Sequence, residues 1–390
     1  MSFSKNRVAL AAAAAVLAAA ACSGNSTVPP AQSMQTNVAP QFTRSDSSIA
    51  KPDDSRSILN KLTKDVVIGS TVDPTNGDTG PHSISVAPVS YGLTKGQLAV
   101  CNFADKTGAA GKGTTIEVFD PKPDATPTPF VQSSDIEVCD GAAVTNSNEV
   151  WASGLTSGLD AGFLDNGKLK KTLGAPLVAP LSDVYAACPP NTPSCLYNAE
   201  YIFTGDAQTG GVVILGVGRY GLHKPLQVVE GFAVNKKAGW SALGPSGLSY
   251  NYPADTLYIA DGVTDTVVGI YHASALLVKN EIIVKPGGKT FKCKYHQSNA
   301  PCGKLIYAGA PLEAPDAMTT LPNGNLIVAN TKHNSLVEID VSDGKVLASK
   351  LIDKSKTAHI FGLASSGTKD RNTVLYYTDT ADNTLHALEQ

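Results

Sequence analysis

The sequence predicts an all-β protein: a six-bladed β-propeller of four-stranded antiparallel blades, closed by an N-terminal strand. Three observations predict this fold. Short β-branched and aromatic runs alternate with Gly, Pro, Asn and Asp along most of the chain, as in strands joined by turns. No helical 3.6-residue periodicity accompanies them. One strand-and-turn unit recurs roughly every 50 residues, and repetition at such a period is typical of propeller blades.

Each copy of the recurring unit is an apolar strand that ends in a small residue and a turn-forming residue. The copies lie at 98–102, 150–153, 201–205, 257–261, 326–330 and 375–379. A short strand precedes each copy, and we assign it to the innermost position of its blade, beside the central channel. A third strand follows most copies, and weaker fourth strands are predicted at 226–229 and 281–284. A seventh blade, in the long interval between the fourth and fifth copies, is the alternative to six.

The last repeat ends at Gln390 after three strands, so its outer strand is missing. The run 65–70 (DVVIGS) lies just before the first repeat. We expect this run to pair with the last blade, because closing the ring removes a sheet edge that would otherwise invite aggregation. The predicted propeller domain spans residues 61–390.

The first residues have the pattern of an export signal. Lys5 and Arg7 precede an Ala/Val/Leu run that ends at Ala21 and is too short to span a bilayer. The small residues directly before Cys22 resemble a bacterial lipoprotein signal, although Ala19 stands where leucine is usual. This resemblance implies that the signal is removed, that Cys22 is lipidated, and that the protein is attached to a membrane of the bacterial cell envelope. Ordinary cleavage with full secretion is the alternative.

These boundaries divide the chain into three parts. Residues 1–21 are the predicted signal peptide. Residues 22–60 begin with the lipidated cysteine and are rich in Ser, Pro, Gln, Asn and Thr. Such a segment buries too little apolar surface to offset its ordering entropy, so we expect a disordered tether between the anchor and the propeller.

The charge balance excludes partners that need a strong electrostatic field. Lys and Arg number 31 and Asp and Glu 34, with the two signs interspersed. The sequence therefore offers no basic patch for nucleic acid or for an anionic lipid surface. We expect a monomer whose partner is a protein or a small-molecule ligand, with contact to a membrane only through the lipid anchor.

The cysteines predict disulfide bonds. An even number follows Cys22, which in an exported chain indicates a disulfide framework. Proximity in the sequence favours Cys188 with Cys195 and Cys293 with Cys302, each pair closing a polar loop. Cys101 and Cys139 would then join successive blades. A zinc site is the weaker interpretation, because no two cysteines have C-x2-C spacing.

The strand order places the starts of the innermost strands around one mouth of the channel. The predicted ring comprises His82, Asp140, Asp183, Ser246, Asp316 and Phe361, and its polar members are the ligand-binding candidates. Carboxylates and a histidine that converge on a concave opening make the best candidate site in this sequence. Oxygen ligands from several blades would also suit a divalent cation such as Ca²⁺ in the channel mouth, although no D-x-D-x-D loop is present.

A second group of candidates lies at the ends of the second strands, in turns around the same mouth. It comprises Asn102, Ser153, Asp261, Asn330 and Asp379. Asp and Asn after a strand commonly bond their own turn backbone, so we assign these residues first to structure. Asp261, Asn330 and Asp379 remain ligand-binding candidates. His333 and His359 are expected to reach the same face.

The repeats resemble bacterial NHL-like propellers, a superfamily that includes gluconolactonase-like and streptogramin-lyase-like proteins. The resemblance rests on units such as GPSGLSYNYPADTLYIADGVTDTVVGIY and APDAMTTLPNGNLIVANTKHNSLVEID. The stretch 80–84 (GPHSI) also resembles the PHGI stretch of the lyases, with Ser83 in place of glycine. The resemblance implies the fold, and it implies one alternative activity: a metal-assisted lyase or lactonase that uses His82, Asp140 and Asp316.

The remaining motifs favour a binding module over an enzyme. The sequence contains no H-E-x-x-H, P-loop or G-x-S-x-G motif. One long insertion, 285–303, is basic and would be closed by the Cys293–Cys302 pair. By the strand order it should overhang the face that carries the site, where long loops on a rigid scaffold are often functional. We therefore expect an exported, membrane-anchored propeller that binds a ligand or a protein.

Overall fold

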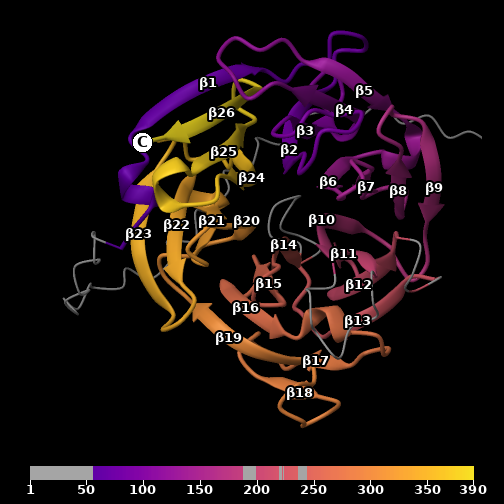
Figure 1. Ribbon diagram of the computed structural model, residues 1–390, viewed down its shortest axis with the longest axis vertical. Helices are drawn as coiled ribbons and strands as arrows, with labels where there is room; N and C mark the ends of the chain where they lie inside the picture. The colour runs from indigo at the N-terminus through magenta and orange to yellow at the C-terminus, as the bar shows by residue number, and fades with distance from the viewer. Residues whose placement is uncertain (1–55, 188–198, 219–221, 223, 236–243) are drawn as a thin grey trace, which may run out of the picture. The chain divides into compact units, whose positions relative to one another are not determined.

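Short β-branched runs separated by turn residues form blades around a central channel (Figure 1). In this computed structural model the described residues are 56–187, 199–218, 222, 224–235 and 244–390. Within them the chain forms six blades of four antiparallel strands, and one blade carries two further strands. No helix in the described part is long and apolar enough to cross a membrane. The predicted all-β propeller is confirmed.

In each blade the strands follow one another from the channel outward. The innermost strands are β2 (Thr79–Val86), β6 (Cys139–Val144), β10 (Pro180–Ala187), β14 (Pro245–Asn251), β20 (Pro315–Thr320) and β24 (Ile360–Ser366). The second strands are β3 (Leu98–Ala104), β7 (Val150–Gly154), β11 (Glu200–Asp206), β15 (Thr256–Asp261), β21 (Leu326–Asn330) and β25 (Val374–Asp379). The third strands are β4 (Ala110–Phe119), β8 (Leu159–Phe163), β12 (Gly211–Gly216), β16 (Thr266–Tyr271), β22 (Ser335–Asp340) and β26 (Thr384–Glu389).

The outer strands and the short helices complete the blades. The outer strands are β5 (Thr128–Gln132), β9 (Leu169–Leu173), β13 (Leu226–Glu230), β19 (Cys302–Ala308), β23 (Lys345–Leu351) and β1 (Lys64–Ser70). The 3-10 helices of the described residues are η1 (Leu59–Lys61), η2 (Ser134–Ile136), η3 (Ala273–Ala275), η4 (Thr331–His333) and η5 (Asp370–Asn372).

The strand β1 closes the ring by pairing antiparallel with β26, as the sequence predicts. Side chains reinforce this closure. Tyr377 Oη donates a hydrogen bond to Asp65 Oδ2 over 2.6 Å, and His386 Nδ1 lies 3.1 Å from Asp65 Oδ1. The first and last strands of the propeller are therefore joined by both backbone and side chains, and the last blade has no free outer edge at β26.

One buried carboxylate anchors the chain where it enters the propeller. Glu338, in β22, is fully buried. Its Oε2 accepts hydrogen bonds from Ser57 Oγ over 2.6 Å and from the Leu59 N–H over 2.9 Å, while Oε1 accepts one from Asn325 Nδ2 over 2.9 Å. Ile58 and Leu59 are buried in the same region. The described chain thus enters near the end of β22, on the face opposite the turns that join the second and third strands.

The third blade is wider than the sequence predicts. Residues 281–284, expected as the outer strand of the fourth blade, contain β17 (Ile282–Val284), which pairs in parallel with β13 of the third blade. A hairpin then leads to β18 (Phe291–Cys293), and β19 supplies the fourth blade's outer strand. The insertion 285–303 lies at the outer rim (Figure 1), so the prediction that it overhangs the site is wrong. Its position follows from the edge of β13, which β17 covers.

Disulfide bonds join neighbouring elements. Cys101 of β3 is bonded to Cys139 of β6, which ties the first blade to the second as predicted. Cys293 and Cys302 join β18 to β19, also as predicted. Cys188, Cys195 and Cys22 lie outside the described residues. Around Cys101 and Cys139, apolar side chains from both blades form a continuous buried cluster, so the disulfide lies within a packed interface.

Candidate functional site

Each innermost strand carries a β-bulge close to its start, at the same level of the channel. The pairing of the first and second strands skips one residue or more, just after the opening pair in five blades and after the pair of Pro81 with Asn102 in the first blade. The first residue skipped in each strand is His82, Asp140, Leu181, Ser246, Asp316 and Phe361. A bulge re-aims a side chain away from the regular pleat, and all of these residues line the channel cavity.

The sequence around the bulge explains why it forms there. In four blades a proline precedes the bulged residue: Pro81, Pro180, Pro245 and Pro315. Proline cannot donate to a strand ladder and is found at strand starts and bulges. The residue after the bulge is small, because the next blade's backbone approaches closely there. A Cβ placed on Gly247 would lie 2.1 Å from the carbonyl oxygen of Asp316.

Five of the six predicted ring residues occupy the bulges, and the sixth lies deeper. The expected third member, Asp183, is two residues beyond the bulge of β10, where the structure places Leu181. Both residues line the cavity. The Pro180–Leu181 dipeptide could have identified Leu181 as the bulged residue, since it matches the Pro-His, Pro-Ser and Pro-Asp pairs of other blades. The strand was predicted to start at Asp183, so the prediction missed Leu181 near its true start.

His82 is held rigidly between two aromatic rings. Its imidazole stacks on Phe103 at 4.0 Å and on Phe361 at 4.1 Å between ring centroids. Its Nδ1 lies 2.9 Å from Asp140 Oδ1, and both side chains are about nine-tenths buried. Burial raises the pKa of Asp140, and the neighbouring His82 partly offsets that rise. Because Nδ1 is used by Asp140, Nε2 is the ring nitrogen that this arrangement leaves for a ligand.

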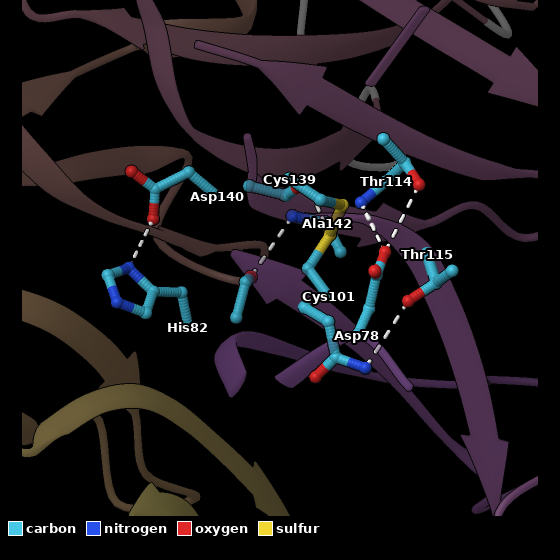
Figure 2. The surroundings of a disulfide bond; sticks show 11 residues. Asp78, His82, Cys101, Thr114, Thr115, Cys139, Asp140 and Ala142 are labelled. Atoms are coloured by element: carbon cyan, nitrogen blue, oxygen red, sulfur yellow. Dashed lines mark hydrogen bonds and ion pairs between the residues drawn. A yellow bond between two sulfur atoms is a disulfide. The ribbon is translucent and has the colours of Figure 1, made fainter. Parts of the chain in front are cut away.

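Figure 2 shows how this pair sits beside the inter-blade disulfide. His82 and Asp140 lie on one side of the Cys101–Cys139 bond, and Asp78 with Thr114 lies on the other. The hydroxyl of Ser83 accepts a hydrogen bond from the Ala142 N–H over 3.0 Å, which joins β2 to β6 beside the pair. Side chain, backbone and disulfide contacts therefore fix the distance between the first two blades at the mouth.

Asp316 is the second ionisable group of the mouth. Its pKa is raised to about 7, first because burial disfavours the charged form and then because the Asp140 carboxylate repels it. His82 and a hydrogen bond from Ser246 act in the opposite direction. Ser246 also bonds the Pro315 carbonyl oxygen over 3.2 Å, which links the fourth blade to the fifth. Near neutral pH, Asp316 is therefore present in both protonation states.

Asp183 belongs to a buried pair of carboxyl groups. Thr204 Oγ1 lies 2.6 Å from Asp160 Oδ2 and 2.7 Å from Asp183 Oδ1. A threonine hydroxyl has one proton, so both contacts are hydrogen bonds only when one carboxyl group is protonated. Burial raises the pKa of Asp160 to about 6, and burial together with the Asp160 charge raises that of Asp183 well above its ordinary value. Asp160, a charged residue within an otherwise apolar third strand, was not among the predicted site residues.

The turn candidates serve the backbone. Asp261 Oδ1 accepts a hydrogen bond from the Val263 N–H, and Asp379 Oδ1 accepts one from the Ala381 N–H. Asn330 Nδ2 donates to the Pro311 carbonyl oxygen, which fastens the connection between blades. Within the described structure none of these three side chains lines the channel cavity. Their contacts are those of turn residues.

The remaining histidine candidates lie apart from the mouth. His333 is exposed, with Nε2 2.6 Å from Glu313 Oε2. His359 Nε2 lies 3.0 Å from Ser355 Oγ. Neither is among the described residues that line the cavity, so His82 has no histidine partner there. The described residues also contain no group of three or more His, Cys, Asp or Glu side chains placed to hold a metal ion. The divalent cation stays a prediction.

The cavity enclosed by the innermost strands has a volume of about 350 Å³. Carboxyl groups of Asp140, Asp183 and Asp316 reach it from three blades, and Leu181 and Phe361 give it an apolar part. None of the described residues that line it is a lysine or an arginine. A space of this size, with convergent polar groups and perturbed pKa values, is what a small-molecule site requires.

Comparisons with known proteins support the fold. No protein-family description and no curated protein sequence matches the chain. A putative gluconolactonase of solved structure is 9% identical over 84% of this chain and 91% of its own, with a TM-score of 0.50. A chain of the nidogen/laminin complex (14% identity, 74% and 84% coverage, TM-score 0.49) and virginiamycin B lyase from Staphylococcus aureus (14%, 84% and 98%, 0.46) are also similar. The likeness to the putative gluconolactonase, at 9% identity, shows the fold alone.

The raised pKa of Asp316 predicts how stability depends on pH. Between about pH 4 and pH 7 the folded state binds more protons at this group than the unfolded state does, because the unfolded pKa is about 4. The contribution of Asp316 to the free energy of unfolding is therefore greatest at low pH, falls as pH rises to about 7, and is constant above. We expect Asp316→Asn to gain stability over the wild type across this range, by up to about 4 kcal/mol.

Urea unfolding at pH 4.5, 6 and 8 checks this expectation. The control is Asp370→Asn, which changes an exposed aspartate in η5. A stability difference between Asp316→Asn and the wild type that is the same at all three pH values would contradict the assignment.

Proposed function

We propose that this protein is an exported, lipid-anchored propeller that binds a small-molecule ligand at the mouth of its central channel. The observation that carries the proposal is the ring of equivalent bulges whose side chains differ from blade to blade. A purely structural ring would repeat one residue type, as the small residues after the bulges nearly do. Here histidine, carboxyl, hydroxyl, aliphatic and aromatic groups surround one cavity, which is the varied set that a specific ligand needs.

The position of the chain's entry supports the anchored arrangement. Arg56 contacts Asp340 at the end of β22, with its Nη1 2.7 Å from Asp340 Oδ2. This end lies opposite the mouth, because β22 starts at the mouth. A tether that leads from a lipidated Cys22 to Arg56 would therefore join the propeller on the face opposite the mouth. A ligand could then reach the site without passing the anchor.

The anchor is tested by replacing Cys22. We expect the wild-type protein, made in a bacterium that processes lipoproteins, to fractionate with membranes and to take up labelled fatty acid. Cys22→Ser should lose the label and appear in the soluble fraction of the envelope or in the medium. Membrane association that is equal in the two proteins would contradict lipid anchoring.

A metal-assisted lyase or lactonase is the second candidate, and the geometry of His82 favours it. An imidazole oriented by a carboxylate through Nδ1 is the arrangement of a general base, and Asp316 with a pKa of about 7 would suit a general acid. In the described structure, the oxygen and nitrogen atoms that could bind a cation come from separate blades. No three metal-binding side chains of the described residues lie together. The binding function is therefore preferred.

Ligand-dependent thermal stability separates the two candidates. A library of small metabolite-like compounds is screened against the wild type, His82→Ala, Asp316→Ala and the control His296→Ala, which changes an exposed histidine at the outer rim. For a binding module, a ligand at 100 times its Kd should stabilise the wild type and the control by about 2.7 kcal/mol. We expect the ring variants to lose at least tenfold in affinity.

The same proteins are assayed for lactone hydrolysis and for lyase turnover, with and without added Mg²⁺. Turnover that needs the metal and disappears in His82→Ala would favour the second candidate. Ligands that stabilise all four proteins equally, without turnover, would contradict a site at the mouth.

A further inference from the structure

The charges of the channel mouth are one-sided. Asp140, Asp183 and Asp316 face the cavity, and no lysine or arginine is among the described residues that line it. His82 can balance the charge of Asp140, which it contacts directly. Asp316 feels the same histidine, and Asp183 has no basic partner in the described structure. One histidine for three carboxyl groups leaves negative charge that a bound cation would balance.

Asp183 is also incompletely bonded. Its side chain is buried and its Oδ2 has no hydrogen-bond partner among the described residues. The nearest protein groups to that carboxyl are Asp160, Thr204 and Ser153, none of which carries a positive charge. Leaving a buried carboxylate oxygen without a donor is unfavourable, because folding removes it from water. Asp183 lines the cavity, so a positive charge placed there would stabilise its ionised form.

The size and walls of the cavity suit an organic cation better than a bare ion. A volume of about 350 Å³ accommodates a small organic molecule. The carboxyl groups are spread over different blades, and the described residues gather no three metal-binding side chains in one place. Leu181 and Phe361 add apolar surface at the level of the ring, which can contact a hydrocarbon part.

We propose that the mouth binds a small organic amine, whose ammonium group donates hydrogen bonds to Asp316 while a second amino group reaches Asp183 deeper in the channel. This inference rests on the proposed small-molecule-binding function and names its ligand class. An ammonium group offers three N–H donors and a positive charge, which are what these two carboxyl groups lack. A neutral compound of the same shape would leave both charges unbalanced.

Binding of such an amine is coupled to protons. The titratable groups that face Asp316 are Asp140 and His82, and the one that faces Asp183 is Asp160. A bound ammonium group stabilises the charged carboxylate, so a carboxyl group that holds a proton in the free protein releases it on binding. Since the pKa of Asp316 is about 7, the amine should bind more tightly at pH 8 than at pH 6.

Isothermal titration calorimetry with 1,4-diaminobutane tests the proposal, and 1,4-butanediol is the neutral compound of matched length. At pH 8 we expect the diamine to bind at least tenfold more tightly than the diol. At pH 6 its affinity should fall about fivefold or more, and the heat of binding should differ between phosphate and Tris buffers because protons are released. Asp316→Asn and Asp183→Asn should each weaken binding at least tenfold, and Asp370→Asn should leave it unchanged.

In Asp316→Asn the pH dependence that comes from this carboxyl group should be lost, and any that remains belongs to other groups, such as the Asp160 and Asp183 pair. If Asp183→Asn does not fold by circular dichroism, Asp316→Asn alone decides the test. Equal binding of diamine and diol, or Ca²⁺ or Mg²⁺ that occupies the site and excludes the diamine, would overturn the ammonium assignment.

The amine assignment can be wrong while the proposed small-molecule-binding function is right. Neutral library compounds that bind in a manner sensitive to His82→Ala, while amines do not bind, would leave a small-molecule site with another ligand class. If neither amines nor any library compound binds in this manner, both proposals are wrong.

Discussion

The close approach of neighbouring innermost strands at the channel mouth is the constraint on which the rest of the site depends. At this level the backbone of one blade lies against the next, so that a Cβ on Gly362 would lie 2.9 Å from the His82 carbonyl oxygen. Only small residues fit after the bulge. The bulged residue itself points into the channel and is free to vary. In each innermost strand, the bulged residue thus supplies the side chain of the site, and the small residue after it allows the blades to pack.

That separation explains how much of the site could be predicted from the sequence. The recurring strands and the unpaired run before them indicate the propeller and its closure, because both follow from local pattern and from the need to cover an edge. Five ring residues were predictable because their strands start at the mouth. Leu181 was not, because its strand begins at Pro180 and not at Asp183, and this proline is visible as a signal only once the bulges are aligned.

Two other features could not be predicted from the sequence, because they depend on contacts between distant segments. The pairing of β17 with β13 joins strands of different predicted blades, and no periodicity in either strand indicates it. Asp160 becomes part of the site only because Asp183, from the next blade, meets it across Thr204. Local sequence pattern indicates which segments form strands and turns. Which side chains of neighbouring blades meet is decided by packing between distant segments.

Several carboxyl groups of this propeller are buried, and their burial lowers its stability. Besides Asp160, Asp183 and Asp316, Glu117 is fully buried, and its pKa is raised to about 9 by burial and by the neighbouring Asp73. Glu338 differs, because hydrogen bonds from the entering chain satisfy its carboxylate. Carboxyl groups retained at the mouth without such donors lower stability near neutral pH, and retained instability of this kind is typical of functional sites.

The central claim is that the bulged side chains of the innermost strands form one ligand site in the channel mouth. A crystal structure of the protein soaked at pH 8 with 1,4-diaminobutane tests it most directly. We expect the compound inside the cavity, with a nitrogen within hydrogen-bond distance of Asp316 and its carbon chain beside Leu181 or Phe361. Bulged side chains directed out of the channel, or an amine bound elsewhere while the mouth holds only water, would contradict the claim.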